Sequence, residues 1–109
     1  MYSLEPTALC LRSQGFTVTT KQKDVGFIAD SASGGGLRAR NGRLDVIVAF
    51  GGGAVERHQI VLGVRRLARQ SQIFAYRIGR ANVVMMWAYP PSDEAKSALV
   101  ACLNMSVRR

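Results

Sequence analysis

A run of three glycines followed by an arginine is the first feature of this sequence that could bind a ligand. Gly51, Gly52 and Gly53 stand between a strand-like stretch and a helix-like one, and Arg57 follows one turn later. Backbone N–H groups at a helix start, together with a guanidinium, form a site for an anion. The spacing matches neither GxGxxG nor GxxxxGK[ST], and a tight turn from strand to helix also requires glycine. An anion site and a purely structural turn are therefore both open.

The chain is strongly basic, with 15 Lys and Arg against 7 Asp and Glu and a net charge of +8. Guanidinium groups bind phosphate and carboxylate in a bidentate manner, so this charge favours acidic partners. Further arginines fall in the helix-like stretch and in a glycine-rich one: Arg65, Arg66, Arg69, Arg38, Arg40 and Arg43. A basic helix face beside a basic loop suits a phosphate backbone. We expect binding of an acidic macromolecule, with nucleic acid as first candidate; a solvated arginine surface without a ligand is the alternative.

Two cysteines, Cys10 and Cys102, lie near opposite ends of the chain, each in a helix-like stretch. If these helices pack side by side, the two sulfurs can form a disulfide. Closing so long a loop would stabilise the fold by roughly 4 kcal/mol in the chain-entropy model, and would suit an oxidising compartment. Two buried thiols in a reducing cytosol are the alternative. The disulfide would favour another function, an exported or envelope-associated structural domain that binds a protein partner.

The other reactive residues show no catalytic or metal-binding pattern. His58 is the only histidine and stands among arginines, and one histidine with two distant cysteines does not form a recognisable zinc site. The acidic residues are scattered, and no Ser or Cys has a context that suggests activation. We therefore expect a protein that is not an enzyme and holds no metal or cofactor. A small enzyme with a substrate pocket lined by Trp87, Tyr76 and His58 is a third interpretation.

A unit that occurs twice is expected to position these residues. Apolar residues recur at a spacing of 58 positions through one helix-like and two strand-like stretches, so that Leu9, Phe16, Val18, Val25 and Phe27 match Leu67, Phe74, Tyr76, Val83 and Met85. Each unit, about 4–30 and 62–89, is too small to bury a sheet face alone, whereas two can share one core. A chain of 109 residues that is 48% apolar fits a single domain, residues 1–109.

The first half of the chain predicts a helix, three strands and a loop. Residue periodicity and flanking turn signals place the helix at Thr7–Gln14 and the first two strands at Phe16–Thr20 and Val25–Asp30. The glycine-rich stretch Ser31–Gly42 is predicted to be a flexible loop, because its glycines permit positive φ angles. This loop leads to a third strand, Leu44–Phe50.

The second half predicts a long helix, a hairpin and a last helix. Apolar residues on one helical face indicate a helix over Ala54–Gln70, and a hairpin follows in Gln72–Tyr89. Two prolines end the hairpin before Ser92 caps the last helix. The order is α-β-β-β-α-β-β-α, and strands joined by tight turns are antiparallel. The sequence therefore predicts an α+β fold, a five-stranded, mainly antiparallel sheet with all three helices packed on one face.

The last strand is apolar on both sides. Val83, Met85 and Trp87 point one way and Val84 and Met86 the other, because side chains alternate along a strand. With helices on one face only, the second set stays exposed, and exposed apolar patches commonly mark interfaces. We therefore predict a homodimer through the open sheet face, formed by Ile28, Ile47, Ile73, Val84 and Met86. In the alternative, a central strand carrying Val84 and Met86 lies under the folded-over glycine-rich loop.

The sequence carries no membrane-spanning or targeting signal. Its longest apolar run, Val83–Tyr89, is far shorter than the roughly 20 residues needed to cross a bilayer. The first residues lack the charged and apolar regions of a signal peptide. As written, the chain is expected to be cytoplasmic, and removal of a leader ahead of Met1 would instead make it a secreted protein.

Overall fold

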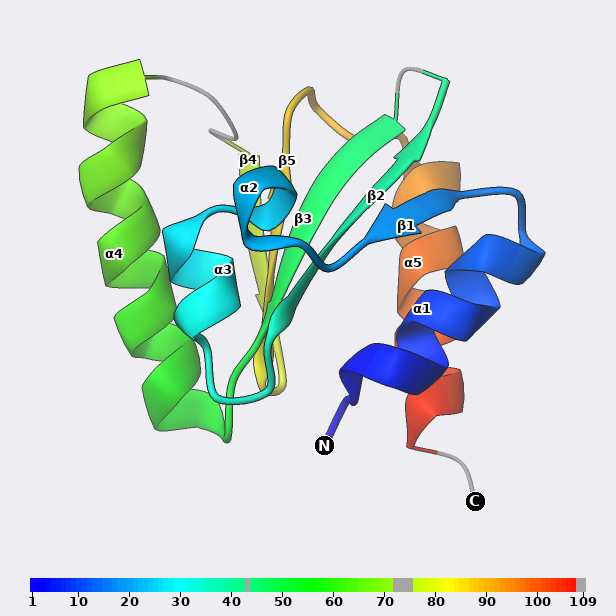
Figure 1. Ribbon diagram of the computed structural model, residues 1–109, viewed down its shortest axis with the longest axis horizontal. Helices are drawn as coiled ribbons and strands as arrows, with labels where there is room; N and C mark the ends of the chain where they lie inside the picture. The colour runs from blue at the N-terminus through cyan, green and yellow to red at the C-terminus, as the bar shows by residue number, and fades with distance from the viewer. Residues whose placement is uncertain (43, 72–75, 108–109) are drawn as a thin grey trace.

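A computed structural model shows one five-stranded sheet between two layers of helices (Figure 1). It describes residues 1–42, 44–71 and 76–107, with the backbone alone for 67–71. The elements are α1 (Leu4–Ser13), β1 (Thr17–Thr19), α2 (Gln22–Val25), α3 (Phe27–Ser31), β2 (Gly36–Asn41), β3 (Leu44–Phe50), α4 (Ala54–Ser71), β4 (Tyr76–Arg80), β5 (Val83–Trp87) and α5 (Asp93–Ser106). The strand order is β1-β2-β3-β5-β4, and all neighbouring strands are antiparallel. The α+β class and the five-stranded antiparallel sheet are confirmed.

The predicted order α-β-β-β-α-β-β-α is also confirmed, with two short helices, α2 and α3, inserted after β1. The strand predicted over Val25–Asp30 is wrong, because α2 and α3 occupy this stretch. The loop predicted over Ser31–Gly42 is wrong for its second part, which forms β2. Val25 and Ala29 are both buried, and a short apolar segment of this kind fits a helix as well as a strand.

Side chains that alternate along the strands divide the core between the two faces of the sheet. On the first face, α1 and α5 cover Val83, Met85 and Trp87 of β5. On the second face, α3 and α4 cover Val84 and Met86 of the same strand. Figure 1 shows these two helical layers on opposite sides of the sheet. The prediction that all helices pack on one face is therefore wrong, whereas the two-sided apolar pattern of β5 is confirmed.

The repeated α-β-β order of the two halves accounts for the placement of α1 and α4 on opposite faces of the sheet. In each half, the strand after the long helix takes an edge of the sheet, β1 or β4, and the next strand, β2 or β5, lies inside. Both β2 and β5 run antiparallel to β3, so they run in the same direction on its two sides. A rotation of 180° about an axis along β3 therefore superposes the strand order of one half on that of the other. Such a rotation swaps the faces, which places α1 and α4 on opposite sides. The residue correspondence fails at the second strand, since Val25 lies in α2 and Val83 in β5.

The apolar face predicted to form a dimer is buried within the chain. Ile47, Val84 and Met86 are 7%, 0% and 5% exposed, because α3 and α4 pack on them. Ile28 packs against the same cluster, and Ile73 lies outside the described residues. Helices and not the glycine-rich segment provide most of this cover. The predicted dimer interface is therefore wrong at Ile47, Val84 and Met86, where helices of the same chain provide the cover. A homodimer as such stays a prediction.

Helices α1 and α5 lie side by side on the first face. Both helices bury apolar residues against the sheet, including Leu11 of α1 and Leu99 of α5. Cys10 and Cys102 form a disulfide between the two helices, with their Cα atoms 5.4 Å apart. The structure thus shows the paired state of the two cysteines.

Helix α4 carries the predicted apolar face on the second side of the sheet. Ile60 and Val64 are buried there, and Val61 is partly buried. In the sequence, Leu67 and Ala68 continue this apolar pattern at helical spacing, and their side chains lie outside the described residues. In the described ranges, neither α4 nor any other helix is long and apolar enough to cross a membrane.

Candidate functional site

The glycine turn before α4 is occupied by groups of the chain itself. The Gly51 N–H donates to the Asn82 carbonyl, and the Gly52 N–H donates to the Glu56 carboxylate, both at 2.7 Å. Glu56 also accepts hydrogen bonds from the hydroxyl and the N–H of Ser33. These three donors, the Ser33 hydroxyl foremost, lower the pKa of Glu56 because they stabilise its charged form. The Gly51 and Gly52 N–H groups are therefore not available to a bound anion, and the turn has a structural role.

Arg57, the second half of the predicted anion site, contacts the β4–β5 hairpin. Its guanidinium donates to the Ala81 carbonyl at 3.0 Å. Its Cδ atom lies 3.4 Å from the position that a Cβ on Gly79 would take. Arg57 thus supports the hairpin, and Gly53, the remaining member of the predicted site, has open space around its Cβ position.

The other predicted arginines that the structure describes lie in two separate elements, β2 and α4. Arg38 and Arg40 belong to β2, whereas Arg65 and Arg66 are exposed on α4, which packs against β4 and β5. In the sheet order, β3 separates β2 from β5. Arg43 and the side chain of Arg69 lie outside the described residues. The described arginines of β2 and α4 therefore do not form one continuous site.

Arg38 is bound within the chain. Its Nε and Nη2 atoms donate to the two carboxylate oxygens of Asp45 at 2.8 and 2.6 Å. This hydrogen bonding to Asp45 raises the pKa of Arg38 above its usual value. Its Nη1 atom also donates to the Asp24 carbonyl. Arg38 thus fixes β2 to β3 and α2, and Arg40 is the β2 arginine left at the surface.

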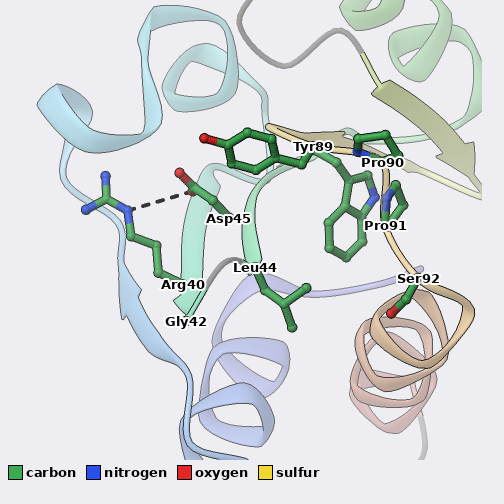
Figure 2. A pocket seen from close by; sticks show the side chains of 9 residues that line it. Arg40, Gly42, Leu44, Asp45, Tyr89, Pro90, Pro91 and Ser92 are labelled. Atoms are coloured by element: carbon green, nitrogen blue, oxygen red, sulfur yellow. Dashed lines mark ion pairs between the residues drawn. The ribbon is translucent and has the colours of Figure 1, made fainter.

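A pocket of about 720 Å³ lies at the opposite end of the sheet from the glycine turn. It forms where β2 turns into β3 and where β5 leads into α5. Its lining residues are Arg40, Gly42, Leu44, Asp45, Trp87, Tyr89, Pro90, Pro91 and Ser92 (Figure 2). This volume falls in the usual range of ligand-binding pockets, roughly 300–1,000 Å³.

The segment after β5 creates this space. The Ala88 N–H still donates to the Asp45 carbonyl at 3.0 Å, but Pro90 and Pro91 have no N–H to continue the ladder. Ser92 then caps α5 by accepting a hydrogen bond from the Ala95 N–H at 3.1 Å. The chain therefore leaves the sheet and crosses to the start of α5, with the pocket between this segment and the β2–β3 hairpin.

The pocket has apolar walls and charge at its rim. Figure 2 shows Tyr89 and the two prolines along one side, with Arg40 and Ser92 on opposite sides. Tyr89 is 67% exposed. The Arg40 side chain is 55% exposed and lies 3.7 Å from a carboxylate oxygen of Asp45 that Arg38 already engages. Arg40 thus holds a weak ion pair and keeps donor capacity toward a ligand.

Trp87 contributes a buried polar group to the wall. It is the only tryptophan of the chain and is 2% exposed. Its indole N–H has no hydrogen-bond partner among the described residues. A buried donor left unpaired costs about 1–3 kcal/mol, and such groups are uncommon in folded proteins. One residue of the pocket lining therefore carries a buried N–H for which the described chain supplies no acceptor.

Two of these residues were predicted from the sequence for other roles. Arg40 belongs to the predicted anion-binding set, and Trp87 to the substrate pocket of the enzyme alternative. Tyr76 is the cross-strand neighbour of Trp87 and His58 is exposed on α4, but neither lines the pocket. A signal for the pocket was present in the run from Trp87 to Pro91, which places two aromatic residues and two prolines directly at a strand end.

Within the described ranges, no group of three or more His, Cys, Asp or Glu residues could hold a metal ion. A comparison of the chain with protein-family models, curated proteins and solved structures finds no match.

Proposed function

We propose that this chain is a non-enzymatic binding domain that recognises a protein partner at the pocket. The composition of the pocket carries this proposal: aromatic and proline side chains form its walls, and the exposed guanidinium of Arg40 lies at its rim. Aromatic residues and arginine are enriched in protein interfaces, because they bury large flat surfaces and bind carboxylates in a directional manner.

The charges around the pocket favour a polypeptide over a nucleic acid. Arg40 shares the rim with Asp45, and the first turn of α5 adds Asp93 and Glu94, of which Asp93 is paired with Lys96 at 3.4 Å. A phosphate backbone would meet these carboxylates, whereas a polypeptide can match both signs of charge.

The disulfide supports a role outside a reducing compartment. Cys10 and Cys102 join the first and last helices, and disulfides persist chiefly in oxidising environments. This favours the exported or envelope-associated domain over the cytoplasmic alternative.

Nucleic acid is the second candidate partner. The net charge of +8 and the exposed side chains of Arg65 and Arg66 favour it. This mode would use the outer surface of α4 and not the pocket. It would also show a steep salt dependence, with a slope of roughly 0.9 logarithmic units for each phosphate contact on duplex DNA.

Selection from a display library of short random peptides on the oxidised protein tests the protein-partner proposal. The wild type should enrich peptides that also bind the Arg65→Gln variant but not the Tyr89→Ala variant, because Tyr89 lines the pocket and Arg65 lies on α4. Enriched peptides that bind Tyr89→Ala equally well would place the site elsewhere. A failure to enrich any peptide, together with salt-dependent DNA binding that is lost in an Arg65→Gln/Arg66→Gln variant, would establish the second candidate instead.

A further inference from the structure

The two edges of the sheet differ in how their backbone groups are covered. The edge strand β1 spans three residues, and the Arg12 side chain donates to the Val18 carbonyl at 3.3 Å. Short edge strands and covering side chains are common means by which folded proteins avoid pairing with another strand. The other edge strand, β4, is longer, with five residues from Tyr76 to Arg80. It is therefore the edge that is more open to a further strand.

The β4–β5 hairpin determines which backbone groups of β4 face outward. Arg80 and Val83 flank a two-residue turn, in which Ala81 has a φ of 50°. Residues that flank such a turn bond to each other, and bonded and non-bonded pairs alternate along antiparallel strands. Every second residue counted back from Arg80 therefore bonds to β5, whereas the N–H and carbonyl groups of Arg77 and Gly79 face away from it. Among the described residues, no hydrogen bond occupies these outward groups.

The α4 side of this edge carries arginines. Arg77 is the cross-strand partner of Met86, so its side chain points to the second face, where α4 packs. Arg57 of α4 packs over Gly79, and the exposed Arg65 lies a little over two helical turns further along α4. Three guanidinium groups are therefore available along one side of β4 to meet carboxylates.

Acidic side chains lie away from the α4 side of the edge. Glu56, the only acid of α4, bonds to the Ser33 backbone and hydroxyl. Asp30 belongs to α3, which packs on β2 and β3. Asp93 and Glu94 begin α5 on the first face, which the sheet separates from α4. Unlike the pocket rim, this side of the edge therefore favours an acidic ligand.

The first-face side of the edge is more apolar. Tyr76 is 45% exposed, and the partly buried Ile78 packs on the core of the first face. Arg80 is held on this side by donating to the Tyr2 hydroxyl at 2.8 Å. Side chains of a strand added beside β4 would point alternately to the two faces. A matching strand thus carries acidic residues at one set of alternate positions and apolar residues at the other.

We infer that the edge of β4 binds an extended segment of a partner protein in which acidic and apolar residues alternate. The segment adds a strand to the sheet and bonds to the outward groups of Arg77 and Gly79. Its carboxylates lie on the α4 side, and its apolar side chains pack on Tyr76 and Ile78. This surface is separate from the pocket, so the inference goes beyond the function proposed above.

Other occupants fit this edge less well. The outward groups of β4 are both donors and acceptors, which matches another polypeptide strand, whereas a phosphate backbone offers acceptors only. A second copy of the chain would bring the arginines of both copies together, and like charges oppose association. An acidic strand turns the same arginines into attractive contacts.

The probe is a synthetic peptide in which glutamate and valine alternate, added to the oxidised, ¹⁵N-labelled protein at near-physiological salt. The backbone amides of Arg77 and Gly79 should shift saturably and exchange their hydrogens more slowly, because they gain partners. The Ile78 amide should already be protected in the free protein, because it bonds to β5. A peptide with lysine in place of glutamate should not bind. A peptide of the same composition with the glutamates and valines in two blocks should bind more weakly.

Backbone methylation separates strand pairing from charge attraction. Only one alternate set of the peptide amides faces β4 in an added strand. Methylation of that set should abolish binding, whereas methylation of the other set should leave the affinity within about twofold. Both methylated peptides carry the same charges. Equal binding of the two would overturn the addition of a strand.

A matched pair of variants tests the role of charge. Arg77→Gln and Arg40→Gln remove the same charge, one from the edge of β4 and one from the pocket rim. Arg77→Gln should weaken the glutamate–valine peptide by roughly tenfold, whereas Arg40→Gln should leave its affinity within about twofold. Gly79→Pro removes an outward N–H and should abolish binding at a near-native melting temperature. If Gly79→Pro does not fold, the methylated peptides test the same bond.

The remaining outcomes each overturn the inference in a different way. Amides of Arg77 and Gly79 that do not respond to the peptide at millimolar concentration exclude binding at this edge. Binding that is lost in Tyr89→Ala and kept in Arg77→Gln would place the peptide in the pocket, in support of the function proposed above. Protection of the same amides in a sedimenting dimer of the protein alone would assign the edge to a second copy. A response to single-stranded DNA and not to the peptide would assign it to a nucleic acid.

Discussion

The two ends of the sheet differ in how completely their polar groups are paired. Where β3 leads into α4, the Asn82 side chain bonds with the N–H and carbonyl of Tyr2 and with the carbonyl of Gly51, and Glu56 accepts three hydrogen bonds. Where β2 turns into β3, the Trp87 N–H finds no acceptor in the described chain and Arg40 contacts Asp45 only at 3.7 Å. The described polar groups are thus more completely paired at the first end than at the second.

The two ends of the sheet also differ in how closely other atoms approach the backbone of their glycines. We call the end where β3 leads into α4 the closed end of the sheet. A Cβ on Gly36, near this end, would lie 2.6 Å from the Cβ of Ala29, closer than folded chains allow. A Cβ on Gly42, in the hairpin at the pocket end, would have no atom within 4 Å. Gly42 is instead favoured by the backbone conformation of the turn, because its φ of 60° lies in the left-handed region. Of these two glycines, the tightly packed one thus lies at the end where the polar groups are also paired.

The largest expected loss of stability comes from adding a methyl group at the close contact between Gly36 and Ala29. Gly36→Ala should reduce the free energy of unfolding by about 3 kcal/mol, because the new methyl group overlaps both the Cβ and the carbonyl oxygen of Ala29. Gly42→Asn is the matched change at the pocket end and should cost less than about 1 kcal/mol, since asparagine tolerates positive φ. Urea denaturation of both variants measures the difference. Equal losses would contradict the contrast between the two ends.

A smaller effect is expected from removing one polar side chain at each end. Asn82→Ala should cost roughly 2–3 kcal/mol, because three backbone groups lose their partner and the site is buried. Ser92→Ala removes the cap of α5 at the pocket end and should cost about 1 kcal/mol. Thermal and urea unfolding provide both values. A greater loss for Ser92→Ala would show that the pocket end contributes more to stability than its pairing indicates.

The smallest effect is a pH dependence at the closed end. The pKa of Glu56 is lower in the folded chain than its ordinary value of 4.5, so its ionised form stabilises the fold. This contribution is present above about pH 4.5 and is lost as the pH falls through the lowered folded value. The stability difference between the wild type and Glu56→Gln should therefore shrink on acidification. Ser33→Ala should reduce the same pH-dependent difference, and an unchanged difference between pH 7 and acid would contradict the role assigned to Glu56.

Long periodic elements of this chain were predictable because their apolar pattern extends over many residues. The stripe of Ile60 and Val64 identified α4, and alternation through residues 83–87 identified β5 and both of its faces. The stretch from Gln22 to Ser31 was not predictable in this way. Its helices span only four and five residues, and the burial of Val25 and Ala29 is compatible with more than one local structure.

The pocket depends on pairing between distant segments. Residues 40–42, 44 and 45 meet residues 87–92 only because β3 and β5 are neighbours in the sheet, and no local pattern specifies this pairing. The unpaired state of the Trp87 N–H depends further on atomic packing around the ring. In contrast, Cys10 and Cys102 could be proposed as partners from the sequence, because the choice was limited to two thiols on two helices.

The disulfide between α1 and α5 also determines how the domain responds to mechanical tension. Cys10 and Cys102 are separated by 92 positions along the chain, yet their Cα atoms are 5.4 Å apart. A force that pulls the two ends of the chain apart passes through the S–S bond and bypasses every strand of the sheet. The oxidised domain therefore acts as a short, inextensible link whose pocket keeps its shape under load. Reduction of the bond would transfer that force to the sheet.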